Sequence, residues 1–303
     1  MDRVLRESDL EDVAKIVKNI IFVPRSETKV TVFLCGGEVS DKTYARSKMA
    51  KIFQQYPRYE LLYPEDLFDD LLAGHGQHSL LTLENILADS VDAIVIFPES
   101  PGSFAELGAF SNNEKLAKKM IVVSNKKYKS NKSFINYGPY RLVKSSKSGK
   151  VTHISYEHLT DTKEKFKIYR RINDYITGIR KLHPVAKDVA NILEAEHFIL
   201  PCIFLMDGVN NVNLYKLMKF ATEHNDSLCE IATRSALGRL TQKKYITRTS
   251  TGYLVTALGS EYVSTTFKSM CLDKARVELI NAESRRNSKV NYDRVKSALT
   301  FSE

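Results

Sequence analysis

The chain has 303 residues, of which 43% are hydrophobic and 27% charged, and its formal net charge is +9. This composition excludes a disordered polymer, and the length fits two domains of roughly 150 residues each. Four cysteines without a short repeated spacing predict neither a disulfide framework nor a zinc site. The start lacks a signal-peptide core, and the most apolar stretch, HFILPCIFLM, is far below the roughly 18 residues of a membrane span. We expect a soluble cytoplasmic protein without metal or cofactor.

The first half of the sequence alternates helical and buried-strand patterns. Ser8-Asp9-Leu10-Glu11 has the pattern of a capping box and opens an amphipathic helix at 8–22. The alternation that follows implies right-handed βαβ units around a parallel sheet flanked by helices, an α/β fold. The polar, lysine-rich segment 125–150 is predicted to be a loop. Strands are predicted at 29–37, 92–97, 119–124 and 151–157, and helices at 41–55, 79–89, 104–117 and 161–182.

The second half changes character after His183-Pro184, which ends the last helix of the first half. We therefore expect one domain at 1–183, with the amino-terminal helix and the sheet, and a second at 184–303. In the second, a short helix at 213–225 precedes either one long helix or a helix pair at 225–246. A hairpin turning at 250–252 and a helical tail follow. This order is typical of a winged helix-turn-helix, a module that serves in protein contacts as well as on DNA.

Basic residues gather in two blocks. Residues 114–150 contain eleven Lys or Arg against one acid, and residues 231–260 contain five basic residues and no acid. Either block alone is as readily explained as a solvated face, but the two together favour contact with a polyanion such as nucleic acid. The candidate nucleic-acid-binding residues are Lys126, Lys127, Lys129, Lys132, Arg234, Arg239, Lys243, Lys244 and Arg248.

Two predicted strands end in residues suited to a ligand. Cys35-Gly36-Gly37 follows the first strand, and the segment from Pro98 to Glu106 follows the second. Ligands of open parallel sheets lie at such carboxyl ends, near helix amino-termini. The usual signatures of hydride transfer and nucleotide triphosphate hydrolysis, G-x-G-x-x-G and G-x-x-x-x-G-K-[ST], do not occur in the sequence. Glu106 either faces a ligand or stabilises the start of a helix, an effect of about 1 kcal/mol or less.

VFLCGGE at 32–38 and SVDAIVIFPESPGSFAELGAF at 90–110 resemble the nucleoside 2-deoxyribosyltransferase family. Gly102, Glu106 and Gly108 match that family's G-x-x-x-E-[LIV]-G-x-A motif. The resemblance implies a flavodoxin-like parallel sheet, with Glu106 as the nucleophile that attacks the anomeric carbon of the sugar. A carboxylate suits this role, because it stabilises an oxocarbenium-like state and then traps it.

The family's acids that contact the leaving base are replaced here. The aspartate six residues before the nucleophile is Ser100, beside Glu99, and counting eight residues back from Asp92 gives Glu84. A cationic base such as that of NAD needs little protonation to leave, which favours cleavage of NAD over base exchange. The candidate substrate-binding residues are Cys35, Gly36, Gly37, Glu84, Asp92, Pro98, Glu99, Ser100, Gly102 and Ser103.

The whole architecture resembles a narrower group, the deoxyribosyltransferase-like effectors with a carboxy-terminal winged helix that accompany bacterial retrons. The resemblance implies a toxic effector of antiphage defence, bound to a reverse transcriptase and its branched RNA–single-stranded DNA hybrid (msDNA), in an oligomeric or filament-like assembly without membrane contact. One alternative is a winged-helix DNA-binding regulator whose first domain senses a nucleotide without catalysis. Another, a nucleoside salvage enzyme, is disfavoured because salvage does not require the second domain.

Overall fold

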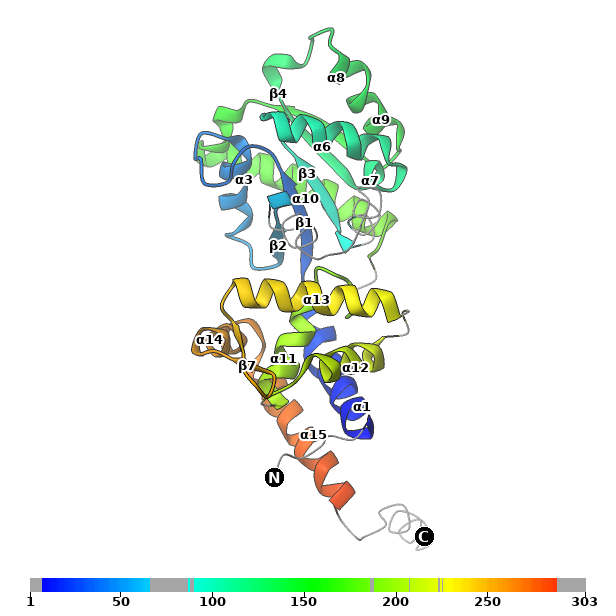
Figure 1. Ribbon diagram of the computed structural model, residues 1–303. Helices are drawn as coiled ribbons and strands as arrows, with labels where there is room; N and C mark the ends of the chain where they lie inside the picture. The colour runs from blue at the N-terminus through cyan, green and yellow to red at the C-terminus, as the bar shows by residue number, and fades with distance from the viewer. Residues whose placement is uncertain are drawn as a thin grey trace, which may run out of the picture. The chain divides into compact units, whose positions relative to one another are not determined.

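The computed structural model describes residues 7–65, 87, 90–185, 188–206, 208–222, 224 and 226–287 (Figure 1). The chain divides into two compact units, one formed by residues 28–186 and the other by residues 1–27 together with 187–303. The amino-terminal helix thus groups with the carboxy-terminal half, whereas the sequence analysis grouped it with the sheet. Each unit is described by itself.

Residues 28–186 form the parallel α/β sheet that the sequence predicts. Its strands are β1 (Val30–Cys35), β2 (Tyr59–Leu62), β3 (Ala93–Ile96), β4 (Met120–Asn125) and β5 (Lys150–Ile154). Their order is β2-β1-β3-β4-β5, and all four pairings are parallel. This is the order of flavodoxin-like sheets, in which the ligand-binding switch point lies between β1 and β3.

The apolar strands alternate their side chains between two covered faces. Val32 and Val95 belong to the core that α3 (Ala45–Phe53) and α10 (Thr162–Leu182) share with the sheet. On the opposite face, the ring of Phe33 packs against Phe110 of α6 (Pro101–Asn112), with ring centroids 6.2 Å apart. Burial on both faces explains why these strands read as continuous apolar runs.

Segment 125–150, predicted to be a loop, contains three short helices. A 3-10 helix (Lys126–Tyr128) precedes α8 (Phe134–Tyr137) and α9 (Pro139–Ser145). Ser133 caps α8 through the backbone amide of Asn136, and Pro139 occupies the first turn of α9. Tyr140 and Val143 of α9 are buried although the segment is rich in lysine. Caps and a few apolar anchors therefore outweigh the polar composition here. Between α6 and β4 lies α7 (Glu114–Lys119).

The second unit is mainly helical. Near the amino terminus, α1 (Glu7–Ile16) continues through a π-helical stretch (Val17–Phe22) into α2 (Val23–Ser26), and α1 packs on the helices of the carboxy-terminal half. The region predicted as one helix or two is a single helix, α13. The remaining elements are α11 (Glu196–Met206), α12 (Asn211–Ala221), α13 (Asp226–Gln242), β6 (Ile246–Arg248), β7 (Tyr253–Val255), α14 (Ala257–Thr266) and α15 (Ser269–Asn287).

A buried charge network ties this unit together. The guanidinium of Arg25 lies 3.3 Å from a carboxylate oxygen of Glu194 and 2.8 Å from Nε2 of His197. Burial acts to raise the pKa of Glu196, but Arg239, His197 and Lys243 outweigh it and hold that pKa at about 2. Within the described part of the chain, no helix is both long and apolar enough to cross a membrane.

Candidate functional site

Glu106 lies on the second turn of α6, directly after the carboxyl end of β3. Ser100 caps this helix in a reciprocal box with Ser103, and Pro101 occupies its first turn. The register that pairs Cys35 with Ile96 brings the end of β1 beside the end of β3. Glu106 therefore lies at the switch point of the sheet, and its side chain is half-buried.

Burial disfavours the ionised form of Glu106, whereas two neighbouring side chains partly stabilise that form. Burial raises the pKa of Glu106 from its ordinary value of 4.5 to about 7. A hydrogen bond with the thiol of Cys35 and the positive charge of Arg46 oppose this rise, whereas the charge of Glu65 adds to it. Burial and the adjacent Glu106 raise the pKa of Cys35 well above its ordinary value, so the thiol stays neutral and donates. A carboxylate with such a pKa is a candidate functional group.

Arg46 is the residue of this site that the sequence analysis missed. Its side chain is 1% exposed, and it donates to both carboxylate oxygens of Glu65 at 2.7 and 2.6 Å and to the carbonyl of Gly37 at 3.0 Å. Its guanidinium also lies 5.0 Å from the ring centroid of Tyr63. Nε is buried without a hydrogen-bond partner among the described residues. A cation in the first turn of a helix opposes the helix dipole, and this unfavourable position is the signal that could have identified it.

The two glycines after β1 make room for protein side chains. A Cβ at Gly36 would lie 2.5 Å from Cβ of Arg46, and one at Gly37 would collide with the ring of Tyr44. From the sequence these two glycines are expected to bind substrate. Within the described residues, packing against the start of α3 is sufficient to require them.

Glu99, Ser100 and Ser103 join the two turns at the carboxyl edge of the sheet. The carboxylate of Glu99 accepts from the backbone amides of Gly37, Ala45 and Arg46 at 3.2, 2.8 and 2.9 Å. The hydroxyl of Ser100 donates to the carbonyl of Gly36 at 3.0 Å.

Ser103 Oγ accepts from the amides of Glu99 and Ser100, and Pro98 is buried beside them. In contrast, Gly102 is exposed, with open space around the position that a Cβ would occupy. Apart from Gly102, the described structure thus uses these candidate substrate-binding residues as the scaffold that positions α3 and α6.

Asp92 is not brought to this edge. It precedes β3, at the opposite end of the strand from Glu106, and one of its oxygens accepts from the amide of Thr31 at 2.8 Å. The other lies 3.2 Å from Nε of Arg180. Asp92 therefore joins β1, β3 and α10 in the interior. Glu84 lies outside the described residues.

The lysines after β4 lie at the same edge of the sheet as Glu106. Lys126 and Lys127 line a cavity of about 490 Å³ together with Lys48 and Tyr156. Lys129 and Lys132 are exposed farther along the segment. Among the described residues, no carboxylate forms an ion pair with any of the four candidate lysines of this segment. Their charges are therefore available to an anion.

The basic residues of the second unit divide into two groups. Arg239 is buried, and its guanidinium contacts Glu196, Ser235 and the carbonyl of Ile192, so the structure places it in the charge network rather than on the surface.

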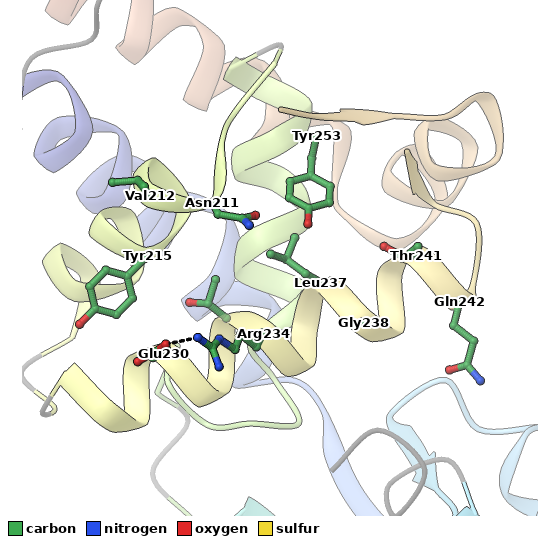
Figure 2. A pocket seen from close by; sticks show the side chains of 11 residues that line it. Asn211, Val212, Tyr215, Glu230, Arg234, Leu237, Gly238, Thr241, Gln242 and Tyr253 are labelled. Atoms are coloured by element: carbon green, nitrogen blue, oxygen red, sulfur yellow. Dashed lines mark ion pairs between the residues drawn. The ribbon is translucent and has the colours of Figure 1, made fainter. Parts of the chain in front are cut away.

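Lys243 is also engaged, with Nζ 2.9 Å from a carboxylate oxygen of Glu196. Arg234, Lys244 and Arg248 form the other group: like Lys243 they are exposed, but they lie outside this charge network. Arg234 forms an ion pair with Glu230 on the outer face of α13, which Figure 2 shows beside a cavity.

Fold and site define a class: an α/β domain of flavodoxin-like strand order, with a half-buried carboxylate at its switch point, joined to a helical unit with a β6–β7 hairpin. Residues 42–248 match the family described as "STM3845 retron effector protein". The chain belongs to this family of retron effectors.

Two proteins of Escherichia coli are similar to the chain. The "Retron Ec86 putative ribosyltransferase/DNA-binding protein" is 46% identical over 281 residues, which cover 90% of this chain and 92% of that protein. The "Retron Ec73 putative ribosyltransferase/DNA-binding protein" is 34% identical over 145 residues, which cover 46% of each. The first similarity extends over both units.

Proposed function

We propose that this retron effector is an N-glycosidase that cleaves the bond between sugar and base in a nucleotide, with Glu106 as its nucleophile. The observation that carries the proposal is the position of Glu106 at the switch point between β1 and β3, half-buried and adjacent to Cys35 and Arg46. The word ribosyltransferase in the names of both relatives supports a reaction at the anomeric carbon of a sugar.

The reaction has two steps. One oxygen of ionised Glu106 attacks the anomeric carbon while the carbon–nitrogen bond breaks, and the bonding electron pair leaves with the base. Water then attacks the same carbon, the ester to Glu106 breaks to regenerate the carboxylate, and the proton lost by the water passes to solvent. Arg46 assists the first step because its charge favours the ionised form of Glu106.

NAD is the substrate that best fits this set of acids. Its cationic nicotinamide becomes neutral when it accepts the bonding electron pair, so its departure needs no proton. Among the described acids near Glu106, the carboxylate of Glu99 is held by three backbone amides and that of Glu65 by Arg46. Neither is poised to protonate a leaving base, which favours a base that leaves without help.

We also propose that the protein acts as the toxic effector of an antiphage system and is restrained in a complex with reverse transcriptase and msDNA. Membership of the retron effector family supports this role. The exposed lysines 126, 127, 129 and 132 offer a surface for phosphates. The exposed Phe134 and Tyr137, whose exposed fractions are 85% and 63%, support a protein contact or homo-oligomer beside them.

The experiment is incubation of the activated effector, together with its reverse transcriptase and msDNA, with NAD, nucleotides and deoxynucleosides. Mass spectrometry identifies the released bases. We expect nicotinamide from NAD, and a loss of about 10³-fold or more in Glu106→Gln. Glu114→Gln is the matched control, because Glu114 lies exposed on the next helix and pairs with Lys118. Equal cleavage by Glu106→Gln, or no cleavage of any substrate by the wild type, contradicts the proposal.

The order of elements in the second unit supports an alternative, a nucleotide-sensing winged-helix regulator without catalysis. Helices α11, α12 and α13 precede the antiparallel pair β6–β7, and Val209, between α11 and α12, pairs with Tyr253. Such an arrangement is common in DNA-binding modules. The two functions differ at Glu106: a sensor binds a nucleotide without releasing its base, whereas the glycosidase binds a nucleotide and releases the base.

A further inference from the structure

A cavity of about 870 Å³ lies on the helical unit, between α12, α13 and β7. Figure 2 shows Tyr215 from α12, Arg234 from α13 and Tyr253 from β7 around it. Four of its other eight lining residues carry an amide or a hydroxyl group. The eight are Asn211, Val212, Glu230, Thr233, Leu237, Gly238, Thr241 and Gln242.

The wall formed by α13 is open because of a glycine. Glu230, Arg234 and Gly238 follow one another at a spacing of four, so they share one face of the helix. Among the described residues, no heavy atom lies within 4 Å of the position that a Cβ would occupy at Gly238. A glycine inside a helix is less favourable than an alanine. Its small size leaves the space in front of the helix free.

We propose that this cavity binds one unpaired nucleotide of a single-stranded nucleic acid. The rings of Tyr215 and Tyr253 offer faces on which a base stacks. The amide of Asn211 both donates and accepts, as recognition of a base edge requires. Arg234, whose side chain is 76% exposed, is placed to bind the phosphate. The inference extends the nucleic-acid contact proposed above and rests on it.

The charges near the cavity favour a polyanion. In the β6–β7 pair, Arg248 is directly opposite Tyr253, so the two side chains lie on the same face of the hairpin. Arg248 is exposed, and residues 231–260 contain no acid. Glu230 is the acid of the lining, and its pair with Arg234 is exposed and therefore weak, so a phosphate can replace it.

The shape and chemistry of the lining disfavour two other occupants. A partner helix is usually held by a stripe of aliphatic side chains, whereas the apolar side chains of this lining are two tyrosines, Tyr215 and Tyr253, besides Val212 and Leu237. A DNA duplex receives a protruding helix in its major groove, whereas a hollow accepts a base that lies outside a stack. An unpaired base therefore fits better than a duplex.

The test fills the cavity from its open side. We compare Gly238→Leu with Gly238→Ala in the full-length chain, by fluorescence anisotropy with labelled oligothymidylate, oligouridylate and a DNA duplex. Both substitutions favour the helix, but only leucine fills the space. We expect Gly238→Leu to weaken single-strand binding about tenfold or more and Gly238→Ala to leave it within about twofold, since stacking contributes about 1–3 kcal/mol per base. The DNA and RNA probes identify which strand is preferred.

Two further variants keep the test independent of folding. Arg234→Gln should weaken binding. Arg276→Gln is the matched control, because Arg276 is also an exposed helical arginine with an acidic neighbour but does not line the cavity, so it should leave binding unchanged. If charge reversal at Lys126, Lys127 and Lys129 weakens binding but Gly238→Leu does not, the cavity inference fails and the proposed contact stands. Tighter binding of duplex than of single strand also overturns the inference. If the wild type binds no nucleic acid, both fail.

Discussion

The edge of the sheet around Glu106 and the outer face of α13 differ in how their charged groups are used. At the sheet edge, Glu99 accepts from the backbone amide of Arg46, and the Arg46 side chain donates to the carbonyl of Gly37. Glu106 is half-buried beside them with a raised pKa. On α13, Arg234 is exposed in a single surface pair. The first region is built to hold one carboxylate in place, and the second is built to exchange partners.

The largest effect is expected at Asp92, which the structure places in the interior, at the opposite end of β3 from the sheet edge around Glu106. Asp92→Asn leaves Arg180 without its buried partner and should destabilise residues 28–186 by about 3 kcal/mol. Thermal unfolding measures this loss, while the Michaelis constant for NAD should not change below the melting temperature. A large rise in that constant at unchanged stability would instead place Asp92 in the substrate site.

A smaller effect is expected from filling Gly36. Gly36→Ala introduces a Cβ at 2.5 Å from Cβ of Arg46 and should cost about 1–3 kcal/mol and reduce activity. Gly102→Ala is the matched control, because open space surrounds that position and the helix gains propensity. Equal melting temperatures for the two variants would show that the start of α3 does not constrain the turn.

The pH dependence of stability isolates the raised pKa of Glu106. Its folded pKa, about 7, is above its ordinary value of 4.5, so the wild type loses stability as the pH rises from 4.5 through 7. Glu106→Gln avoids this loss and should be more stable than the wild type above pH 7, by about 1–2 kcal/mol after allowance for partial exposure. Denaturant unfolding at pH 4.5 and pH 8 measures it. A constant difference across this range contradicts the assignment.

Arg46 should affect the same titration through its charge. Arg46→Gln removes a cation that favours ionised Glu106, so the acidic limb of the activity profile should move upward by about one pH unit. Arg46→Lys should restore part of the shift, because it keeps the charge. A lower activity with an unmoved limb would mean that Arg46 only supports the fold.

The smallest effect per residue is expected for the affinity contributed by the exposed lysines after β4, Lys126, Lys127 and Lys129. Charge reversal at Lys126, Lys127 and Lys129 should weaken association with msDNA and reduce the dependence of log K on log salt by about 2, since each phosphate contact on a single strand contributes about 0.7. Reversal at the α10 lysines 163, 165 and 181 is the control. Unchanged affinity and slope at 126, 127 and 129 would exclude this surface.

The sheet could be predicted from the sequence because β1, β3 and β4 are buried on both faces and therefore read as apolar runs. β2 was missed because it is short and only partly buried at the sheet edge. The motif placed Glu106 correctly at the start of α6, after a buried strand. Its ligand contacts remain a prediction.

The number of basic residues in the block at 231–260 does not show which of them are exposed. Arg234 and Arg239 are five residues apart on α13, so their side chains point about 140° apart around the helix. Lys243, four residues after Arg239, reaches the same buried partner, Glu196. The partner lies about forty residues away in the sequence, which local pattern does not reveal. The role of Arg46 depends in the same way on Glu65 and Gly37, which only the fold brings to it.

The most direct test of the account is a covalent trap at Glu106. An NAD analogue with fluorine at the 2′ position of the nicotinamide riboside slows hydrolysis of a glycosyl ester, and peptide mapping by mass spectrometry then locates the sugar. The account predicts an adduct on the peptide that contains Glu106, with stoichiometric release of nicotinamide and no adduct in Glu106→Gln. Release of nicotinamide with the sugar on another residue, or an unmodified Glu106 in an enzyme that the analogue inactivates, would contradict it.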